Sequence, residues 1–287
     1  MFDAELARRP WHRGEAAAQR LAAAVATPPV IRPFMSEQLR QFFPQLSLLF
    51  LAAVDADGFP SATFLRGARG FIACPEPTRM EIDATLFEAD PLAIVLRRDS
   101  EVGLLGVDFR TRRRNRIGGC VESLEAGRTT IGVTEAFGNC PKYIRQRETV
   151  DALTSDAQRS WRPLNGFDAA AKDVIANAET FFIASSANCD WGGVDISHRG
   201  GPPGFVEVAD DGTITVPDFR GNGYFNTFGN LLVQPRAGLL FPCFDTGEAL
   251  RLAGIVQILW EGPEVASRLG AERLWRFKPC RGWRLRR

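Results

Sequence analysis

Two stretches, Arg116-Ile-Gly-Gly-Cys-Val-Glu-Ser-Leu124 and Arg251-Leu-Ala-Gly-Ile-Val-Gln-Ile-Leu259, decide the fold because the second repeats the first at an offset of 135 residues. Three more pairs of segments recur in the same order and at nearly the same offset: Leu49–Ala52 with Phe181–Ala184, Gly70-Phe71 with Gly204-Phe205, and Val102–Leu105 with Ala237–Leu240. Coincidence would not keep order and spacing together at four places. The sequence therefore predicts two homologous units in tandem.

The repeated units have the pattern of β-structure. Short apolar runs such as Leu48–Val54 alternate with turn signals such as Asp55–Gly58, and each unit has one short helical piece. Strand-dense units of about 100 residues are typical of small barrels. We therefore predict a mainly β fold, a β-barrel with a few helices, in two copies of roughly six strands each.

The repeat also suggests a division of the chain. The expected parts are an N-terminal helical segment at 1–45 with a helix from about Glu5 to Val25, copy one at 46–147, a helical linker at 148–178, and copy two at 179–287 with a basic C-terminal tail. Within these parts, Ser36 precedes a short helix, and Asp168–Ala178 reads as the linker helix.

Composition argues against several classes of function. The net charge is +1, so nothing in the overall charge favours nucleic acid or an anionic membrane surface. The longest apolar runs, such as Leu46–Val54, are too short to span a bilayer, and the charged N-terminus lacks a signal-peptide core. Six scattered cysteines and two histidines give no disulfide framework and no metal site. We expect a cytoplasmic protein.

A comparison of the two copies separates scaffold from chemistry. Apolar positions and glycines match, but four polar positions of copy two have different counterparts in copy one: Asp195, Ser197, His198 and Arg199 against Ser61, Thr63, Phe64 and Leu65. Because strand residues alternate between faces, Asp195, Ser197 and Arg199 are expected on one face and His198 on the other. Copy two therefore has a candidate site, which is degenerate in copy one. The alternatives are a hairpin with a solvated polar face and, for His198, a packing role.

The stretch Asp218–Asn230 has the pattern of an anion site. It follows an expected strand, Thr213–Pro217, and holds asparagines at 222, 226 and 230 with Arg220 before the expected helix start. Residues four apart share one helix face, and a helix N-terminus with an arginine attracts anions. The counterpart Ala84–Glu101 has no asparagine. We therefore predict a phosphate site; the alternative is an ordinary surface helix with a glycine-rich entry.

Several of these segments together resemble the pyridoxamine 5′-phosphate oxidase-related, FMN-binding split-barrel family. The resemblance covers nearly the whole chain and is carried by Phe182–Ser186, Asp195–Phe205, Pro217–Asn222 with Asn226, Asn230 and Pro235–Leu240, and by Phe137–Tyr143 and His12–Glu15. It departs from the best-known oxidases at Asn226 and Asn230, where a basic residue would be usual. The resemblance therefore supports flavin binding better than vitamin B6 oxidation.

The resemblance implies a six-stranded antiparallel split barrel that pairs around FMN. Here the tandem copies would form that pair as an intramolecular pseudo-dimer. The strand Asp195–Arg199 would lie along the isoalloxazine ring, Arg220–Asn230 would hold the phosphate, and Asn139–Tyr143 would close the site. The expected cofactor ligands are Ser185, Ser186, Asp195, Ser197, His198, Arg199, Asp218, Arg220, Asn222, Asn226, Asn230, Asn139 and Lys142, and the candidate catalytic residues are His198 and Tyr143.

An FMN-dependent oxidoreductase is the function that the resemblance implies. The expected partner is a small-molecule substrate or an electron donor, either NAD(P)H or a reductase or ferredoxin. A homodimer in addition to the internal pair is left open. The alternatives are a non-catalytic flavin-binding or ligand-sensing protein, and a tandem barrel that has lost its cofactor and serves as an interaction scaffold. The polar set of copy two argues against that scaffold.

Two further features have more than one interpretation. The run Arg110–Arg116 lacks the interleaved aromatic residues of a nucleic-acid surface. The alternatives are a basic turn with the start of a strand, or a segment that interacts with a phosphate, an acidic partner or the opposite domain. Cys140 is either a redox-active thiol or a buried structural one.

Overall fold

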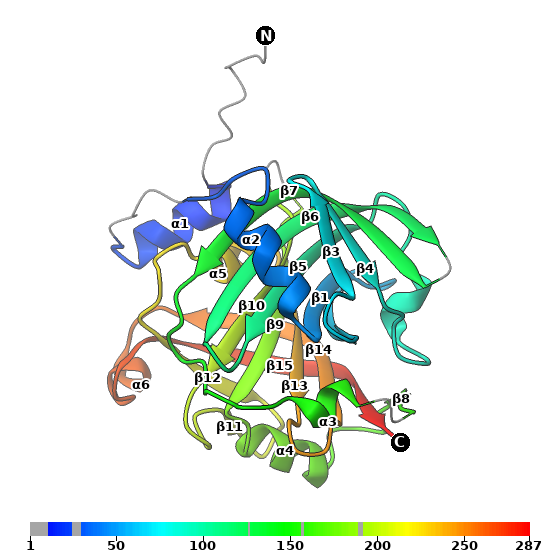
Figure 1. The fold of residues 1–287 in the computed structure, drawn as a ribbon. Coiled ribbons are helices and arrows are strands. Elements are labelled where there is room, and N and C mark those ends of the chain that lie inside the picture. Colours follow the sequence, from blue (N-terminus) through cyan, green and yellow to red (C-terminus); the bar gives the residue numbers. More distant parts are fainter. Residues whose placement is uncertain (1–10, 25–29, 126, 156–157, 189–191) are drawn as a thin grey trace.

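The chain forms two antiparallel β-sheets, one above the other in the view of Figure 1. The computed structural model describes residues 11–24, 30–125, 127–155, 158–188 and 192–287. The first sheet has the strand order β2-β1-β5-β6-β7-β4-β3, and the second has the order β10-β9-β13-β14-β15-β12-β11, with β8 paired to β15. The mainly β fold expected from the sequence is confirmed.

The strands of each sheet come from one of the two repeated units. In copy one they are β1 Leu48–Val54, β2 Pro60–Arg66, β3 Ile72–Glu76, β4 Arg79–Asp83, β5 Glu101–Asp108, β6 Arg113–Glu125 and β7 Arg128–Asn139. The second sheet holds β8 Ser160–Pro163, β9 Thr180–Ser186, β10 Val194–Gly200, β11 Glu207–Val208, β12 Ile214–Phe219, β13 Arg236–Pro242, β14 Ala249–Leu259 and β15 Ala271–Arg286.

The two sheets share topology and register. Each strand from β1 to β7 occupies the place in its sheet that β9 to β15 occupy in the other. Leu105 is paired with Arg116, and Leu240 with Arg251, so the repeat seen in the sequence corresponds to a structural repeat. Each path holds seven strands where roughly six were expected, because both halves include a short outer hairpin strand; β11 has only two residues.

Helices are short and lie around the sheets. They are α1 Arg13–Leu21, α2 Glu37–Phe42, α3 Asp151–Thr154, α4 Ala169–Ala176, α5 Asn226–Val233 and α6 Pro263–Ala266, with 3-10 turns at Phe43–Gln45 and Pro91–Ile94. The helix expected from about Glu5 to Val25 is α1. It begins after the cap His12 and ends at Leu21, and residues 1–10 and 25 lie outside the described part of the chain.

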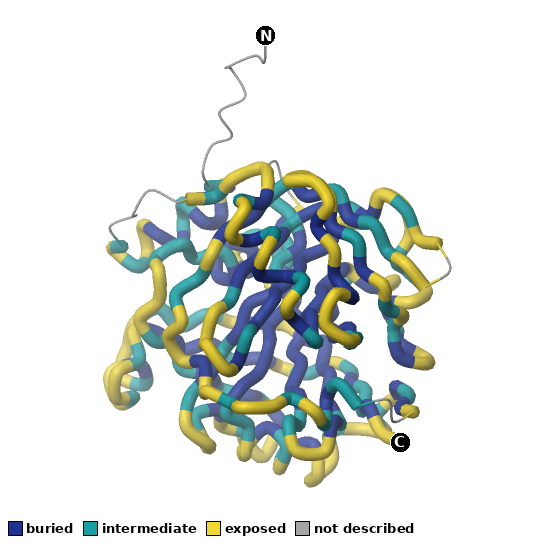
Figure 2. Tube along the Cα trace, in the orientation of Figure 1, coloured by how far each residue is buried: buried dark blue, intermediate teal, exposed yellow. Residues whose placement is uncertain are grey.

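Three apolar clusters form the interior. One lies inside copy one and includes Leu39 and Phe42 of α2. A second lies inside copy two and includes Ala18 of α1 and Ile175 of α4. The third lies between the copies, where the buried strands run through the centre of Figure 2. The two helices of the N-terminal segment therefore pack on different copies, α1 on copy two and α2 on copy one.

The contact between the copies is centred on equivalent residues. Phe50 of β1 and Phe182 of β9 stack with their ring centroids 3.6 Å apart. A Cβ on Gly103 would lie 2.5 Å from the Val194 carbonyl oxygen, and a Cβ on its counterpart Gly238 would lie 2.3 Å from the carbonyl oxygen of Pro60. Only glycine allows backbones to approach so closely. The copies therefore meet as an intramolecular pseudo-dimer, with reciprocal contacts.

Within the described residues, every helix is too short or too polar to cross a membrane.

We expect Phe50→Ala to lower the free energy of unfolding by about 3–5 kcal/mol, because it leaves a cavity in the cluster that joins the copies. Urea denaturation measures this change. Ile94→Ala is the control, since Ile94 is 86% exposed; its effect is expected to stay within about 0.5 kcal/mol. A loss below about 1 kcal/mol for Phe50→Ala would show that the stacked pair does not hold the copies together.

Candidate functional site

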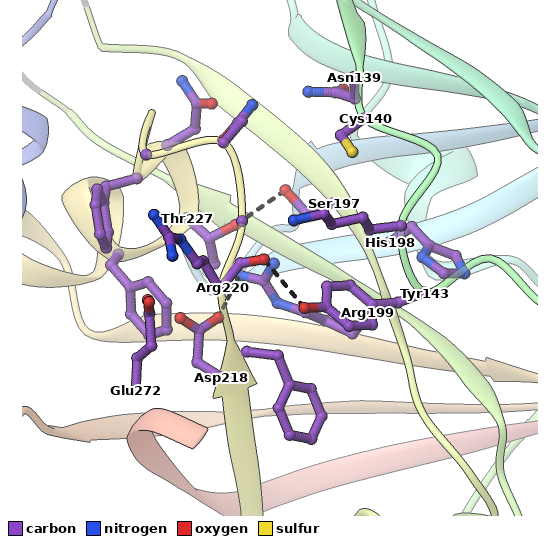
Figure 3. Close-up of a pocket in the computed structure, with 18 of the residues that line it drawn as sticks. Asn139, Cys140, Tyr143, Ser197, His198, Arg199, Asp218, Arg220, Thr227 and Glu272 are labelled. Atoms are coloured by element: carbon purple, nitrogen blue, oxygen red, sulfur yellow. Dashed lines mark hydrogen bonds and ion pairs between the residues drawn. The ribbon is translucent and has the colours of Figure 1, made fainter. Parts of the chain in front are cut away.

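A cavity of about 480 Å³ lies where the two copies meet. Copy two lines it with β10, the end of β12, the loop that follows, the start of α5 and residues Glu272 and Arg273 of β15. Copy one contributes residues of β5 and β6, the end of β7 and the segment that follows it, and Ala22–Ala24 line another part of the wall. Figure 3 shows Asn139 and Cys140 entering from the copy-one chain, away from Asp218 and Glu272. The cavity is within the usual size range for a small-molecule site.

The N-terminus of α5 opens into this cavity. Its cap, Phe225, has a left-handed backbone with φ 60° and makes no side-chain capping bond. The residues Asn226, Thr227 and Phe228 of the first turn line the cavity. Because the first N–H groups of a helix have no partner within it, they carry a partial positive charge toward the cavity.

The loop before α5 corrects part of the expected geometry. Arg220 was expected just before the helix, with the three asparagines on one helix face, but α5 starts only at Asn226. The chain between β12 and α5 is a loop in which Gly223 and Phe225 have positive φ values. Asn222 lies in that loop and accepts a hydrogen bond from the Tyr224 N–H at 3.2 Å. Arg220 and Asn222 still line the cavity.

Positive charge dominates the cavity wall. Six basic side chains line it: Arg114, Arg116, Lys142, Arg199, Arg220 and Arg273. Two lining carboxylates, Asp218 and Glu272, both pair with Arg273, and Asp218 also lies 3.8 Å from Arg199. Among the described residues, Arg114, Lys142 and Arg220 have no carboxylate partner. The cavity is therefore complementary to an anion.

Arg116 reaches across from copy one into the polar face of β10. It donates to Asp195 Oδ1 at 3.0 Å and to the hydroxyl of Ser197, which also accepts a hydrogen bond from Thr227 at 2.9 Å. Arg199 lies on the same side, near Asp218. His198 lies on the other side of the strand, against Phe182 in the contact between the copies. The expected alternation along β10 is therefore present.

Four expected ligands do not line the cavity: Ser185, Ser186, Asp195 and Asn230. The side chain of Asn230 is buried and donates to Ser185 Oγ at 3.1 Å and to Asp195 Oδ2 at 2.9 Å. Asp195 is further occupied by Arg116. Asn230 faces this buried network because it lies one helical turn beyond Asn226, away from the open end of α5. These hydrogen-bonded side chains therefore lie behind the cavity wall and stabilise it.

His198 is a neutral hydrogen-bond donor in this setting. Arg114 Nη1 donates to His198 Nδ1 at 3.2 Å, so the ring proton is on Nε2, which is buried without a partner in the described structure. Burial and then the charges of Arg114 and Arg199 hold the pKa of His198 well below its usual value. Burial and neighbouring arginines also lower the pKa of Arg114 to about 10, which leaves it charged at neutral pH. This state does not suit His198 to general acid catalysis near pH 7.

The segment after β7 forms a strap over the cavity. Arg114 Nε donates to the Cys140 carbonyl at 2.9 Å. The Tyr143 hydroxyl donates to the Arg220 carbonyl at 3.0 Å (Figure 3). Tyr143 has φ 65° and its ring lies 5.6 Å from that of Phe219. The strap therefore connects copy one to the loop before α5. Asn139, Cys140 and Lys142 line the cavity from this side, as the sequence motif predicted for Asn139 and Lys142.

The equivalent place in copy one is filled by protein. Arg251, the counterpart of Arg116, makes two bonds of 2.9 Å to the buried carboxylate of Asp90. Asp90 also accepts from the hydroxyl of Thr63, the counterpart of Ser197, and from the Leu92 N–H at a 3-10 helix start. Trp161 covers Arg251, with the guanidinium carbon 4.1 Å from the ring centroid. Beside these side chains, copy one keeps a smaller and less charged pocket of about 180 Å³, which is lined by Leu65, Ala84 and Arg128 among others.

The most important residues that sequence reasoning missed are arginines. Arg114 and Arg116 lie at the end of the run Arg110–Arg116. Contact with the opposite domain was one of the alternatives left open for this run, and both arginines make that contact. Arg273 was not considered. Its pair with Asp218 repeats the exposed pair of Arg128 with Asp83 in copy one, so aligning the ends of the last strands could have found it.

We expect both histidines to remain neutral at pH 6.5, because burial lowers the pKa of His12 as well as that of His198. Imidazole NMR signals followed against pH give the two titrations, and the variants His12→Gln and His198→Gln assign them. A titration midpoint at or above about 6.5, the ordinary value, would contradict the neutral state of His198.

Comparisons with known proteins give only distant likenesses. No family model and no curated protein matches the chain. The similar solved structures include a protein from Lactobacillus delbrueckii proposed to be a pyridoxamine 5′-phosphate oxidase, at 19% identity over 37% of this chain and 95% of that one, with TM-score 0.29. An FMN-binding protein from Syntrophomonas wolfei matches at 15% identity over 40% and 82%, with TM-score 0.31. HutZ, the heme storage protein from Vibrio cholerae, matches at 12% over 39% and 89%, with TM-score 0.27. All three scores are below 0.5, so the ligand has to be argued from the cavity itself.

Proposed function

We propose that this chain is a flavoprotein that binds FMN in the cavity between its two copies. The observation that carries the proposal is the cationic wall around the uncapped N-terminus of α5. Three basic side chains, Arg114, Lys142 and Arg220, line the same cavity as the first turn of α5 and have no carboxylate partner within the described part of the chain. Arg114 is partly buried, where a charge without a counterion is costly, and the exposed Lys142 and Arg220 add to a positive potential that attracts an anion.

The donor set fits both ends of FMN. The first N–H groups of α5 with Arg220 suit a phosphate group, which helix N-termini and arginines bind well. Phe219, Phe225 and Phe228 supply aromatic surface for a flat ring. Two buried polar atoms, His198 Nε2 and Asn139 Oδ1, have no partner in the described structure and suit the polar edge of such a ring.

We further propose that the protein is an oxidoreductase. FMN supplies the redox chemistry when bound, and the protein contributes binding, orientation and electrostatics. In that division of work, Ser197 and His198 present hydrogen-bonding groups along β10, the aromatic side chains exclude water, and the strap at Asn139–Tyr143 closes one side. Lys142 and Tyr143 are exposed at the cavity, where a small-molecule substrate, NAD(P)H or a reductase or ferredoxin would approach.

We expect the wild-type protein to bind FMN with one site per chain, and Arg220→Ala to weaken binding roughly 10- to 100-fold, the usual range for a lost bond to a charged group. Fluorescence quenching of added FMN measures the dissociation constant. Arg110→Ala is the matched control because it removes one exposed positive charge from the turn outside the cavity wall.

The outcome that would overturn the proposal is a wild-type protein that does not change the fluorescence or absorbance of FMN at any concentration tested. Equal weakening by Arg220→Ala and Arg110→Ala would instead show a general charge effect and argue against Arg220 as a phosphate ligand.

We expect anaerobic mixing with NADH or NADPH, or with a reduced ferredoxin, to bleach the absorbance of bound FMN faster than that of free FMN. The protein holds the ring in one orientation, which lowers the entropic part of the barrier. Stopped-flow absorbance gives the rate. Bound FMN that none of these donors reduces faster than free FMN would favour the non-catalytic flavin-binding or ligand-sensing role.

A further inference from the structure

The N-terminal helix α1 rests directly on the helix that opens into the cavity. A Cβ on Gly14 would lie 2.1 Å from the carbonyl oxygen of Gly229 in α5, and a Cβ on Gly229 would lie 2.6 Å from the Glu15 nitrogen. Neither position can hold a larger residue without moving one helix. The two backbones therefore touch at a pair of glycines, and the position of α5 depends on α1.

A chain of buried hydrogen bonds fixes this contact at its polar end. Glu15 Oε2 accepts from the His12 N–H at 3.0 Å, and Glu15 Oε1 accepts from Asn226 Nδ2 at 2.5 Å. His12 Nδ1 accepts from the Gly14 N–H, so His12 Nε2 donates to Asn230 Oδ1 at 3.0 Å. Both helical asparagines of α5 are thus held by the N-terminal segment.

The same segment fixes the loop that leads into α5 and lines the cavity. Gln19 donates to the Tyr224 carbonyl at 3.4 Å, and the Trp11 ring meets the Tyr224 ring edge-on at 5.1 Å. After α1 ends, Ala22–Ala24 form part of the cavity wall. The start of α5 is therefore held on both sides of its cap, and the holding segment also borders the ligand space.

The contact between α1 and α5 contains hydrogen-bonding groups that apolar packing alone would not require. Ala18 of α1 already gives an apolar contact with the core of copy two. Replacing buried ionisable groups by an apolar pair is often neutral for stability, and in some proteins such groups specify one orientation of the elements that they join. Glu15 and His12 are 6% and 5% exposed, so their polar groups act on neighbours inside the protein.

We infer that the segment His12–Ala24 is a clamp that sets the position of α5 for anion binding, with His12, Gly14 and Glu15 as positioning residues. This inference rests on the proposed function only for the identity of the ligand. The clamp itself is a property of the protein alone. When α1 is docked, the first N–H groups of α5 point into the cavity and Ala22–Ala24 border it; when α1 is displaced, both lose their support.

The stability of the contact between α1 and α5 depends on the protonation of Glu15. Burial and then the charge of Asp195 on β10 raise the pKa of Glu15 to about 8, with a smaller contribution from Glu135 on β7, while the His12 N–H and Asn226 bonds act in the opposite direction. The folded protein therefore keeps a proton that the unfolded chain releases near its ordinary pKa of about 4.5. The contribution of Glu15 to the free energy of unfolding is complete below about pH 4.5, the pKa of the unfolded chain, and is lost as the pH rises through about 8.

We expect Glu15→Gln to remove this dependence on pH. The difference in unfolding free energy between wild type and Glu15→Gln should shift in favour of the variant as pH rises from about 5 to about 8, because only the wild-type residue titrates there. Urea denaturation at several pH values measures it. A difference that stays constant across this range would show that Glu15 does not hold its proton in the folded state.

The clamp is tested with Gly14→Val, which wedges α1 away from α5. Amide hydrogen exchange of peptides covering Asn226–Val233, measured without ligand, should become at least about tenfold faster, and the FMN dissociation constant should rise by a similar factor. Arg20→Val is the control, since it places the same side chain on the exposed end of α1. Unchanged exchange in α5 for Gly14→Val would overturn the inference.

Two further comparisons separate the clamp from other causes. Glu15→Gln keeps an oxygen that can accept from Asn226 and should retain most of the affinity that Glu15→Ala loses; equal losses would contradict a positioning role for the acceptor. If wild type does not bind FMN, the proposed function fails, while the exchange of α5 in Gly14→Val still decides whether α1 holds that helix.

Discussion

The ion pairs that cross between the copies are the constraint on which the rest of the structure depends. An arginine at the same position of each copy, Arg116 and Arg251, reaches into the other copy and is almost completely buried there. A buried guanidinium needs a counterion, so each arginine requires a carboxylate at a defined place on the far side. The glycine contacts and the stacked phenylalanines bring the backbones close enough for these bonds, and together they prevent the copies from sliding.

The two counterions are supplied differently, and this difference leaves a larger cavity in copy two than at the equivalent place in copy one. Arg116 is neutralised by Asp195, which lies on strand β10 itself. Arg251 is neutralised by Asp90, which comes from the segment that corresponds to α5 and also caps a helix start. The residue at the position of Asp90 in copy two is Phe225, which cannot cap. In copy one, the Asp90 carboxylate accepts the hydrogen bond at the helix N-terminus. In copy two, we propose that the ligand anion takes this position.

The sequence could predict the frame because repetition and strand alternation are local and periodic. The repeated stretches and the alternation of Asp195, Ser197 and Arg199 follow from such patterns, whereas Asn139 and Lys142 were expected only from the family resemblance. Partners that are far apart leave no local signal: Arg116 and Asp195 are separated by 79 positions, and Arg273 and Asp218 by 55. Asn230 was misplaced for a related reason. The spacing of four residues places Asn230 on the same helix face as Asn226, but it does not show where along the helix that face becomes buried.

The two copies share one frame, but the segment His12–Ala24 packs on α5, and this contact makes the two halves differ around that helix. The segments between β4 and β5 and between β12 and β13 differ in length by one residue, but the strand pairings on both sides keep the offset of 135, so Gly229 corresponds to Ile94. Gly229 lies under α1 in direct backbone contact, whereas Ile94 is 86% exposed with no such helix over it. Duplication supplied two equivalent helix starts at the contact between the copies. The start in copy one is supported by the buried Asp90 carboxylate, whereas the start in copy two is supported by Glu15 of the N-terminal segment and has no side-chain cap of its own.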